Sequence, residues 1–311
     1  MLMDTRKAIL IIALIGLAGQ RVLAQTEDAE LKPPDLGILI GNTLLPGLLQ
    51  TTNGEPEGYA YMVGGPLYLV GVTLQVDYLF NQADPNRQWE LGTSLPLSEI
   101  GLSLESYSLY AFERDLNNRK PGVAAPKPRE PYLSLLLAPY NPSNLFDPAV
   151  ISVLGLVTIP SFTYDAINTM GSYFARSSVS FFGLQVSPVA GLCLESAFSL
   201  AINLFIASAE ELIFRGVVLD RLGPTVSAIS FGAFHLGNIF IAFSPSTTPF
   251  SASQLEAVGQ QAAFALCFGV YANILTTEND YSLQKPITIH YWNNVFSMIV
   301  SYLEGNGIGG P

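Results

Sequence analysis

The 311-residue chain has only two histidines, and each lies four residues from another side chain suited to a binding site. His235 follows Phe231, and His290 precedes Asn294, in segments that are otherwise largely apolar. Side chains four residues apart share one face of a helix. Ionisable groups in membrane-like surroundings are costly and usually functional, so both histidines are candidates for chemistry.

Two adjacent carboxylates and an arginine form a third cluster upstream, Glu210-Glu211-x-x-x-Arg215. On a helix, Glu211 and Arg215 stand in the favourable order for an ion pair. Glu210 points about 100° away and lacks that partner. We expect Arg215 to hold Glu211 ionised and Glu210 to exchange protons, a division of roles that acid–base catalysis uses. The alternative is a helix end whose charges reach the membrane interface.

The spacing around a turn predicts that Glu210 and His235 meet. Leu222-Gly223-Pro224 is typical of a turn with proline at the first position of the next helix. Glu210 precedes Leu222 by twelve residues, and His235 follows Gly223 by twelve. Antiparallel helices across this turn would place the two side chains at the same depth. A last helix beginning at Pro286 would bring the third cluster to the same side.

These groups suit the attack of water on a carbonyl. Glu210 and His235 can hold and deprotonate the water, and His290 and Asn294 can donate hydrogen bonds to the developing oxyanion. No serine or cysteine adjoins a histidine, so the sequence shows no local covalent nucleophile. We expect no cofactor and no metal. A zinc ion bound by Glu210, His235 and His290 is the less favoured alternative, because the HExxH spacing is absent.

The composition is that of a membrane protein. Hydrophobic residues make up 49%, charged residues only 13%, and the mean hydropathy is +0.36. The net charge of −11 argues against a nucleic-acid partner, which requires a basic face. Cys193 and Cys267 lie in apolar runs and predict no disulfide framework. The expected surroundings are therefore a lipid bilayer.

The N-terminus has the pattern of a signal peptide. A short basic region is followed by the apolar run Ala8–Gly19, and small residues end at Ala24. Residues 1–24 are thus expected to be a signal peptide or, alternatively, an uncleaved anchor. This segment favours a multi-pass protein of the bacterial inner membrane.

The apolar runs predict an all-α, polytopic transmembrane helical bundle with about 7–8 spans. The region 25–189 contains Leu36–Leu49, Tyr59–Phe80, Leu95–Phe112, Tyr132–Ile159 and, too short to span, Val179–Val189. Acidic residues interrupt the third run at Glu99 and Glu105, and residues 140–148 break the fourth. A four-helix catalytic core is expected at 190–304, in the runs Ala190–Phe214, Pro224–Phe243, Leu255–Leu275 and Pro286–Leu303. Residues 305–311 form a Gly-rich tail.

The basic residues predict the orientation. Five of the fourteen Lys and Arg residues fall between residues 114 and 129, so this loop is expected in the cytoplasm. Counting spans from there puts Arg221 and Lys285 on the same side. The polar clusters would then meet in the cytoplasmic half of the bundle.

The three motifs in this order resemble the CAAX protease and bacteriocin-processing (CPBP) family of intramembrane endopeptidases, whose patterns are EExxxR, FxxxH and HxxxN. The resemblance covers about residues 190–304. It implies a helical membrane bundle with a conical cavity, a peptide or membrane-protein substrate, and a water activated by Glu210 with His235. It also implies an oxyanion site at His290 and Asn294. The chain departs from the family in its signal-like N-terminus, in the long connection Thr276–Lys285, and in residues 25–189, which resemble nothing known.

Two other classes of function remain open. A non-catalytic member of the same family could bind or scaffold a membrane partner through the same cavity. The intact set of four site residues favours the peptidase. An ion-coupled transporter is a poorer interpretation, because no inverted repeat is visible in the sequence.

Overall fold

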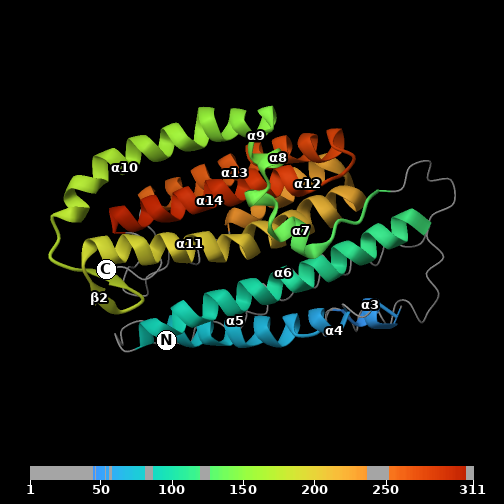
Figure 1. Ribbon diagram of the computed structural model, residues 1–311, viewed down its shortest axis with the longest axis horizontal. Coiled ribbons are helices and arrows are strands. Elements are labelled where there is room, and N and C mark those ends of the chain that lie inside the picture. Colours follow the sequence, from blue (N-terminus) through green and yellow to red (C-terminus); the bar gives the residue numbers. More distant parts are fainter. Residues whose placement is uncertain are drawn as a thin grey trace.

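The computed structural model describes residues 45, 47–52, 54–55, 58–80, 87–119, 127–236 and 252–305. This part of the chain is almost entirely helical, as the all-α prediction required (Figure 1). The signal segment 1–24, and the tail beyond Gly305, lie outside the described residues.

Two long helices form one side of the bundle. The short helices α3 (Leu48–Thr52) and α4 (Gly58–Tyr61) lead into α5 (Gly64–Phe80), which packs along α6 (Gln88–Arg119). The two backbones approach closely, since a Cβ added at Gly71 would lie 2.3 Å from the backbone nitrogen of Ser98. Glu99 and Glu105, which interrupt the apolar run Leu95–Phe112, lie within α6, a continuous 32-residue helix that is not among the stretches apolar enough to cross a membrane.

A chain of short helices precedes the next long one. In order these are α7 (Tyr132–Leu136), the 3₁₀ helix η3 (Ala138–Tyr140), α8 (Pro142–Leu145), α9 (Pro148–Val153), the π-helix η4 (Leu154–Thr158) and α10 (Ile159–Phe174). Asn141 and Asp147 cap α8 and α9 by accepting bonds from backbone amides. The predicted break at 140–148 is confirmed. However, the apolar helix continues to Phe174 and does not end at Ile159.

A β-hairpin follows where the sequence suggested only a short apolar run. Strand β1 (Val179–Phe181) pairs antiparallel with β2 (Leu184–Val186). The two loop residues, Phe182 and Gly183, both have positive φ, of 47° and 84°, which is the turn geometry that matches the strand twist. This hairpin is a local exception to the all-α prediction.

The C-terminal part carries the three polar clusters. It comprises α11 (Pro188–Glu211), the π-helix η5 (Leu212–Val218), α12 (Leu219–His235), α13 (Ala252–Glu278) and α14 (Gln284–Glu304). Helix α11 packs against α14 and α6, and α12 packs against α13. Gly223, with φ of 82°, interrupts the helical backbone just before Pro224. The predicted turn is therefore confirmed, and Pro188–His235 contains two helices joined at that turn.

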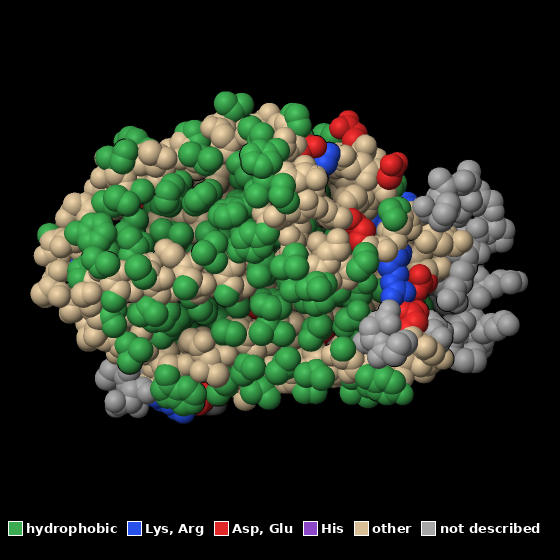
Figure 2. Space-filling model, in the orientation of Figure 1, with side chains coloured by type: hydrophobic (Ala, Val, Ile, Leu, Met, Phe, Trp, Pro, Cys, Tyr) green, Lys and Arg blue, Asp and Glu red, His purple; other side chains and the backbone are tan. Residues whose placement is uncertain are grey.

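Among the residues that the structure describes, three stretches are long and apolar enough to cross a membrane: Pro148–Phe174, Pro188–His235 and Val258–Glu278. Apolar side chains cover most of the visible face, and charged side chains gather toward one end (Figure 2). The chain is thus a membrane protein by composition and helix length. The total of seven to eight spans and the separate four-helix core stay predictions.

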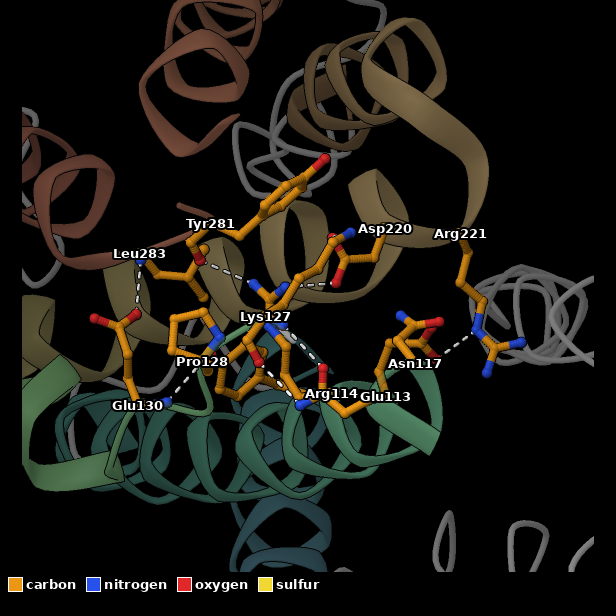
Figure 3. A network of polar contacts seen from close by, with 12 residues as sticks. Glu113, Arg114, Asn117, Lys127, Pro128, Glu130, Asp220, Arg221, Tyr281 and Leu283 are labelled. Atoms are coloured by element: carbon orange, nitrogen blue, oxygen red, sulfur yellow. Dashed lines mark hydrogen bonds and ion pairs between the residues drawn. The ribbon is translucent and has the colours of Figure 1, made fainter. Parts of the chain in front are cut away.

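A network of ion pairs lies at the end of the bundle where the charged side chains gather, and we call it the charged end (Figure 3). Arg114 of α6 contacts Asp220 of α12 at 2.7 Å and donates to the carbonyl of Tyr281 at 2.9 Å. Lys127 contacts the second oxygen of Asp220 at 2.9 Å, and Arg221 contacts Glu113 at 2.5 Å. The network ties α6 to the start of α12 and to the α13–α14 connection. The opposite end, where β1 and β2 lie, is called the hairpin end.

Candidate active site

The structure brings together one side chain from each polar cluster. Glu210 lies in the last turn of α11, His235 ends α12, and His290 is in the second turn of α14. The Oε2 atom of Glu210 is 3.9 Å from Nε2 of His235 and 3.6 Å from Nε2 of His290. The turn at Gly223 brings His235 back to the depth of Glu210. Helix α14 runs antiparallel to α11 and so places His290 beside Glu210.

Glu211 is fully buried and binds two cationic or donor groups. Its Oε1 atom is 3.0 Å from a guanidinium nitrogen of Arg215 and 2.8 Å from Nδ1 of His290. The ion pair with Arg215 is the expected one. The bond to His290 joins residues 79 apart in sequence and was not predicted. Glu211 therefore fixes the orientation of the His290 ring as well as that of Arg215.

Both histidines turn the same ring nitrogen toward Glu210. Nδ1 of His235 is 2.9 Å from the carbonyl oxygen of Phe231, which can only accept, so Nδ1 carries the proton. Nδ1 of His290 faces the carboxylate of Glu211 in the same way. In a neutral imidazole this leaves Nε2 as an acceptor. Either Nε2 atom can donate only when its ring is an imidazolium.

Aromatic rings wall the site. The Phe231 ring centroid is 4.6 Å from that of His235 and 5.6 Å from that of His290. The guanidinium of Arg215 lies over the same ring, 4.1 Å from its centroid. Phe268 of α13 also packs on His290, at 5.4 Å. The sequence predicted the contact of Phe231 with His235, but the contribution of Phe268 was missed.

Several buried polar atoms of the site have no hydrogen-bond partner among the described residues. They are Oε2 of Glu210, Oε2 of Glu211, and Nε and Nη2 of Arg215. An unsatisfied buried polar atom costs about 1–3 kcal/mol. The π-helix η5 begins directly after the carboxylate pair, and π-helical turns are frequent at functional sites. The arrangement leaves the Glu210 oxygen available to a reactant.

Asn294 is the least constrained of the four predicted site residues. It is half-buried, one turn beyond His290 on α14, and the described part of the chain gives its amide no hydrogen bond. Its side chain therefore shares a helix face with His290 by spacing alone. The role at the oxyanion stays a prediction.

The candidate site also contains side chains of the types that bind a metal ion. Glu210, His235 and His290 are the right types and number for zinc, and each Nδ1 has the supporting acceptor that metal-bound histidines use. Within the described ranges, however, no group of three or more His, Cys, Asp or Glu residues is arranged to hold a metal ion. The zinc content of the purified protein therefore distinguishes a zinc mechanism from a mechanism that uses Glu210 without a metal.

One further carboxylate near the site was missed. Glu99 of α6 interacts electrostatically with Glu210, because α6 packs along α11 and η5. In the sequence, Glu99 was interpreted only as an interruption of an apolar run. The packing of α6 on the core was not predictable from either helix alone.

Residues 193–296 match the family model described as type II CAAX prenyl endopeptidase Rce1-like. No curated protein and no solved structure matches the chain. The matched segment lies within the expected core 190–304 and includes all the predicted site residues. The resemblance to the CAAX protease family is therefore shown for this segment.

Proposed function

We propose that this membrane protein, whose residues 193–296 match the Rce1-like family model, is an intramembrane endopeptidase that uses a water activated by Glu210. The observation that carries the proposal is the Oε2 atom of Glu210. It is buried, lacks a hydrogen-bond partner in the described structure, and faces Nε2 of both histidines. A carboxylate placed in this way is suited to hold a nucleophilic water.

The reaction follows from these positions. A water held by Glu210 and by Nε2 of His235 gives a proton to Glu210 as its oxygen bonds to the peptide carbonyl carbon. The carbonyl becomes an oxyanion. When the C–N bond breaks, the proton on Glu210 passes to the leaving amine, and the carboxylate is regenerated.

The oxyanion requires donors. The amide of Asn294 donates in every protonation state. His290 donates from Nε2 as the imidazolium, because Glu211 already accepts the proton on Nδ1. Two donors stabilise the oxyanion more than one, so a loss of either should slow the reaction.

The site opens toward the cytoplasm in this proposal. Lys127, Arg114 and Arg221 gather at the charged end, and basic residues favour the cytoplasmic side. The proposed location is the bacterial inner membrane, with residues 1–24 as the signal segment. The substrate is a peptide or membrane-protein segment whose scissile bond lies near this boundary.

The test is the isosteric pair Glu210→Gln and Glu211→Gln, made in the full chain. Membrane fractions that carry wild type, either variant or no enzyme are compared by quantitative proteomics for cleaved termini. Glu210→Gln should lose the cleavage products, with turnover reduced on the order of 10²–10⁴-fold, while the protein folds and inserts normally. Identical products from wild type and Glu210→Gln at equal expression would overturn the proposal and favour a binding or scaffolding role.

Whether the reaction requires a bound zinc ion is tested separately. Metal content of the purified protein should be far below one zinc per chain, and activity should survive exhaustive chelation. Stoichiometric zinc, with activity lost on removal and restored on its return, would replace this mechanism by a metallopeptidase mechanism that uses Glu210, His235 and His290 as ligands.

A further inference from the structure

A line of buried polar side chains runs along α11 away from the candidate active site. Glu195, Ser199 and Asn203 follow one another at four-residue intervals, and each is at most 1% exposed. The hydroxyl of Ser199 donates to Glu195 at 3.1 Å, and the amide of Asn203 donates to the Ser199 carbonyl at 2.8 Å. Residues four apart lie on the same face of a helix, so these three side chains form a continuous stripe. We call this stripe the polar seam.

The seam faces α14 and leads to the site. The amide nitrogen of Asn203 is 3.0 Å from the sulfur of Met298, and Glu211 meets His290 at 2.8 Å. Asn294 is four residues from each of these α14 residues, so it lies between the two contacts. This position continues the seam from Asn203 through Asn294 to the histidine beside Glu210.

The seam contains polar atoms that the protein does not satisfy. Oε2 of Glu195 and Oδ1 of Asn203 are buried and have no hydrogen-bond partner in the described part of the chain. Two such atoms on one interface are unfavourable by about 1–3 kcal/mol each unless water binds them. Buried water typically satisfies groups of this kind.

The far end of the seam reaches a cavity at the hairpin end. The cavity has a volume of about 290 Å³, and Tyr173, Tyr302 and Arg176 are among its lining residues. Glu195 interacts electrostatically with both tyrosines. One turn earlier, a Cβ added at Gly191 would lie 2.6 Å from the Tyr302 hydroxyl. The start of the seam therefore lies near two tyrosines that line this cavity.

We propose that the polar seam is a single-file water path from the hairpin-end cavity to Glu210. Four residues of helix rise about 6 Å, a separation that a bridging water can span between polar groups. Each peptide bond hydrolysed consumes one water, which must reach Glu210 while the substrate occupies the site. That the path supplies the hydrolytic water rests on the proposed function, whereas the existence of the path does not.

The path is tested with silver ion, a thiol-reactive probe of about the size of water. In full-length protein with Cys193→Ala and Cys267→Ala, reconstituted in liposomes, single cysteines are placed by Ser199→Cys in the seam and by Ala201→Cys. Ala201 is exposed on the outer face of α11 at nearly the same depth. Ser178→Cys, at the cavity mouth, is the positive control. Silver binding is measured as the loss of later maleimide labelling after unfolding.

Ser199→Cys should react on the order of tenfold or more faster than Ala201→Cys, because only a hydrated thiol forms the reactive thiolate readily. Equal, slow rates at both positions would overturn the water path. In a second arm, Ser199→Val should lower kcat with little change in KM. Unchanged kcat alongside fast silver binding would overturn the delivery role. Absence of Glu210-dependent cleavage would overturn the proposed function and leave the silver result standing.

Discussion

Among the described residues, two ion pairs are completely buried, but their polar atoms are hydrogen-bonded to different degrees. Arg114 and Asp220 at the charged end have no solvent exposure, and neither do Arg215 and Glu211 in the site. Both oxygens of Asp220 are paired, since Lys127 binds the second one.

In the candidate active site, by contrast, one oxygen of Glu211 and two nitrogens of Arg215 lack hydrogen-bond partners within the described structure. At the charged end, only one nitrogen of Arg114 lacks a partner among the described residues. Burial alone therefore does not distinguish the ion pair at the charged end from the one in the proposed active site. The completeness of hydrogen bonding does.

The largest expected effect on stability is at the charged end. Arg114→Ala removes one partner of a buried pair and should destabilise the fold by about 3–5 kcal/mol. The loss is measured by denaturant unfolding of the purified protein in detergent. Glu210→Gln is the matched control, and its stability should be close to that of wild type because Oε2 of Glu210 has no hydrogen bond to lose in the described structure. Equal stability of Arg114→Ala and Glu210→Gln would remove the distinction between the two regions.

Glu211→Gln should have a mixed effect. The neutral amide keeps a weaker contact with Arg215 but no longer supplies the charge shared by Arg215 and His290. We expect destabilisation of about 1–3 kcal/mol and a fall in turnover of about 10–100-fold, as for other residues that orient a reacting group. Turnover and unfolding free energy are measured on the same preparation. A variant with wild-type turnover would show that His290 needs no orienting partner.

Gly216 tests whether the two ion pairs are mechanically linked. It lies in η5 between them, and an added Cβ would be 2.5 Å from a ring carbon of the buried Tyr110 on α6. Gly216→Ala should cost about 1–3 kcal/mol by overpacking. Gly171→Ala is the control, because a Cβ there meets nothing within 4 Å. If both variants unfold alike, α6 yields without strain and the link is absent.

The smallest effect concerns a partly exposed ion pair at the start of α14, between Lys285 and Asp147. The hydrogen bond from Lys285, at 2.8 Å, holds the pKa of Asp147 below its ordinary value, and the backbone amide of Ala149 acts in the same direction. Because the folded pKa is the lower one, the contribution is complete above about pH 4 and is lost as pH falls through the lowered pKa.

Such a pair contributes at most about 1 kcal/mol. Lys285→Gln should therefore flatten the fall in unfolding free energy between neutral and acidic pH. An unchanged pH profile would show that other acidic groups account for the slope.

The sequence predicted what depends on spacing within one helix or across one turn. Glu211 pairs with Arg215 as four-residue spacing requires, and the turn at Gly223 has the backbone that its glycine and proline indicated. Matching depths across that turn also anticipated the approach of His235 to Glu210.

The remaining features depend on packing between distant segments. The bond from His290 to Glu211 and the nearness of Glu99 to Glu210 arise from the registers of α14 and α6 on α11. Hydropathy left α6 doubtful as a membrane span because of Glu99 and Glu105, and it could not show that the segment is one long helix packed against α5 and α11. The hairpin at 179–186 was missed, since a short apolar run does not reveal its pairing.

The π-helix η5 has a consequence for how this protein can change. It separates Glu210 and Glu211 in the proposed active site from Asp220 in the ion-pair network of the charged end, along one continuous helical path. A π-helical turn holds an extra residue, and each residue of an α-helix adds about 100° of rotation. Deleting one residue of η5 would rotate the carboxylates relative to the clamp while both stay on the same path. The segment thus sets the rotation of the carboxylates about the helix axis relative to Asp220, so a deletion or insertion confined to it can turn the carboxylates while the ion pair at the charged end stays in place.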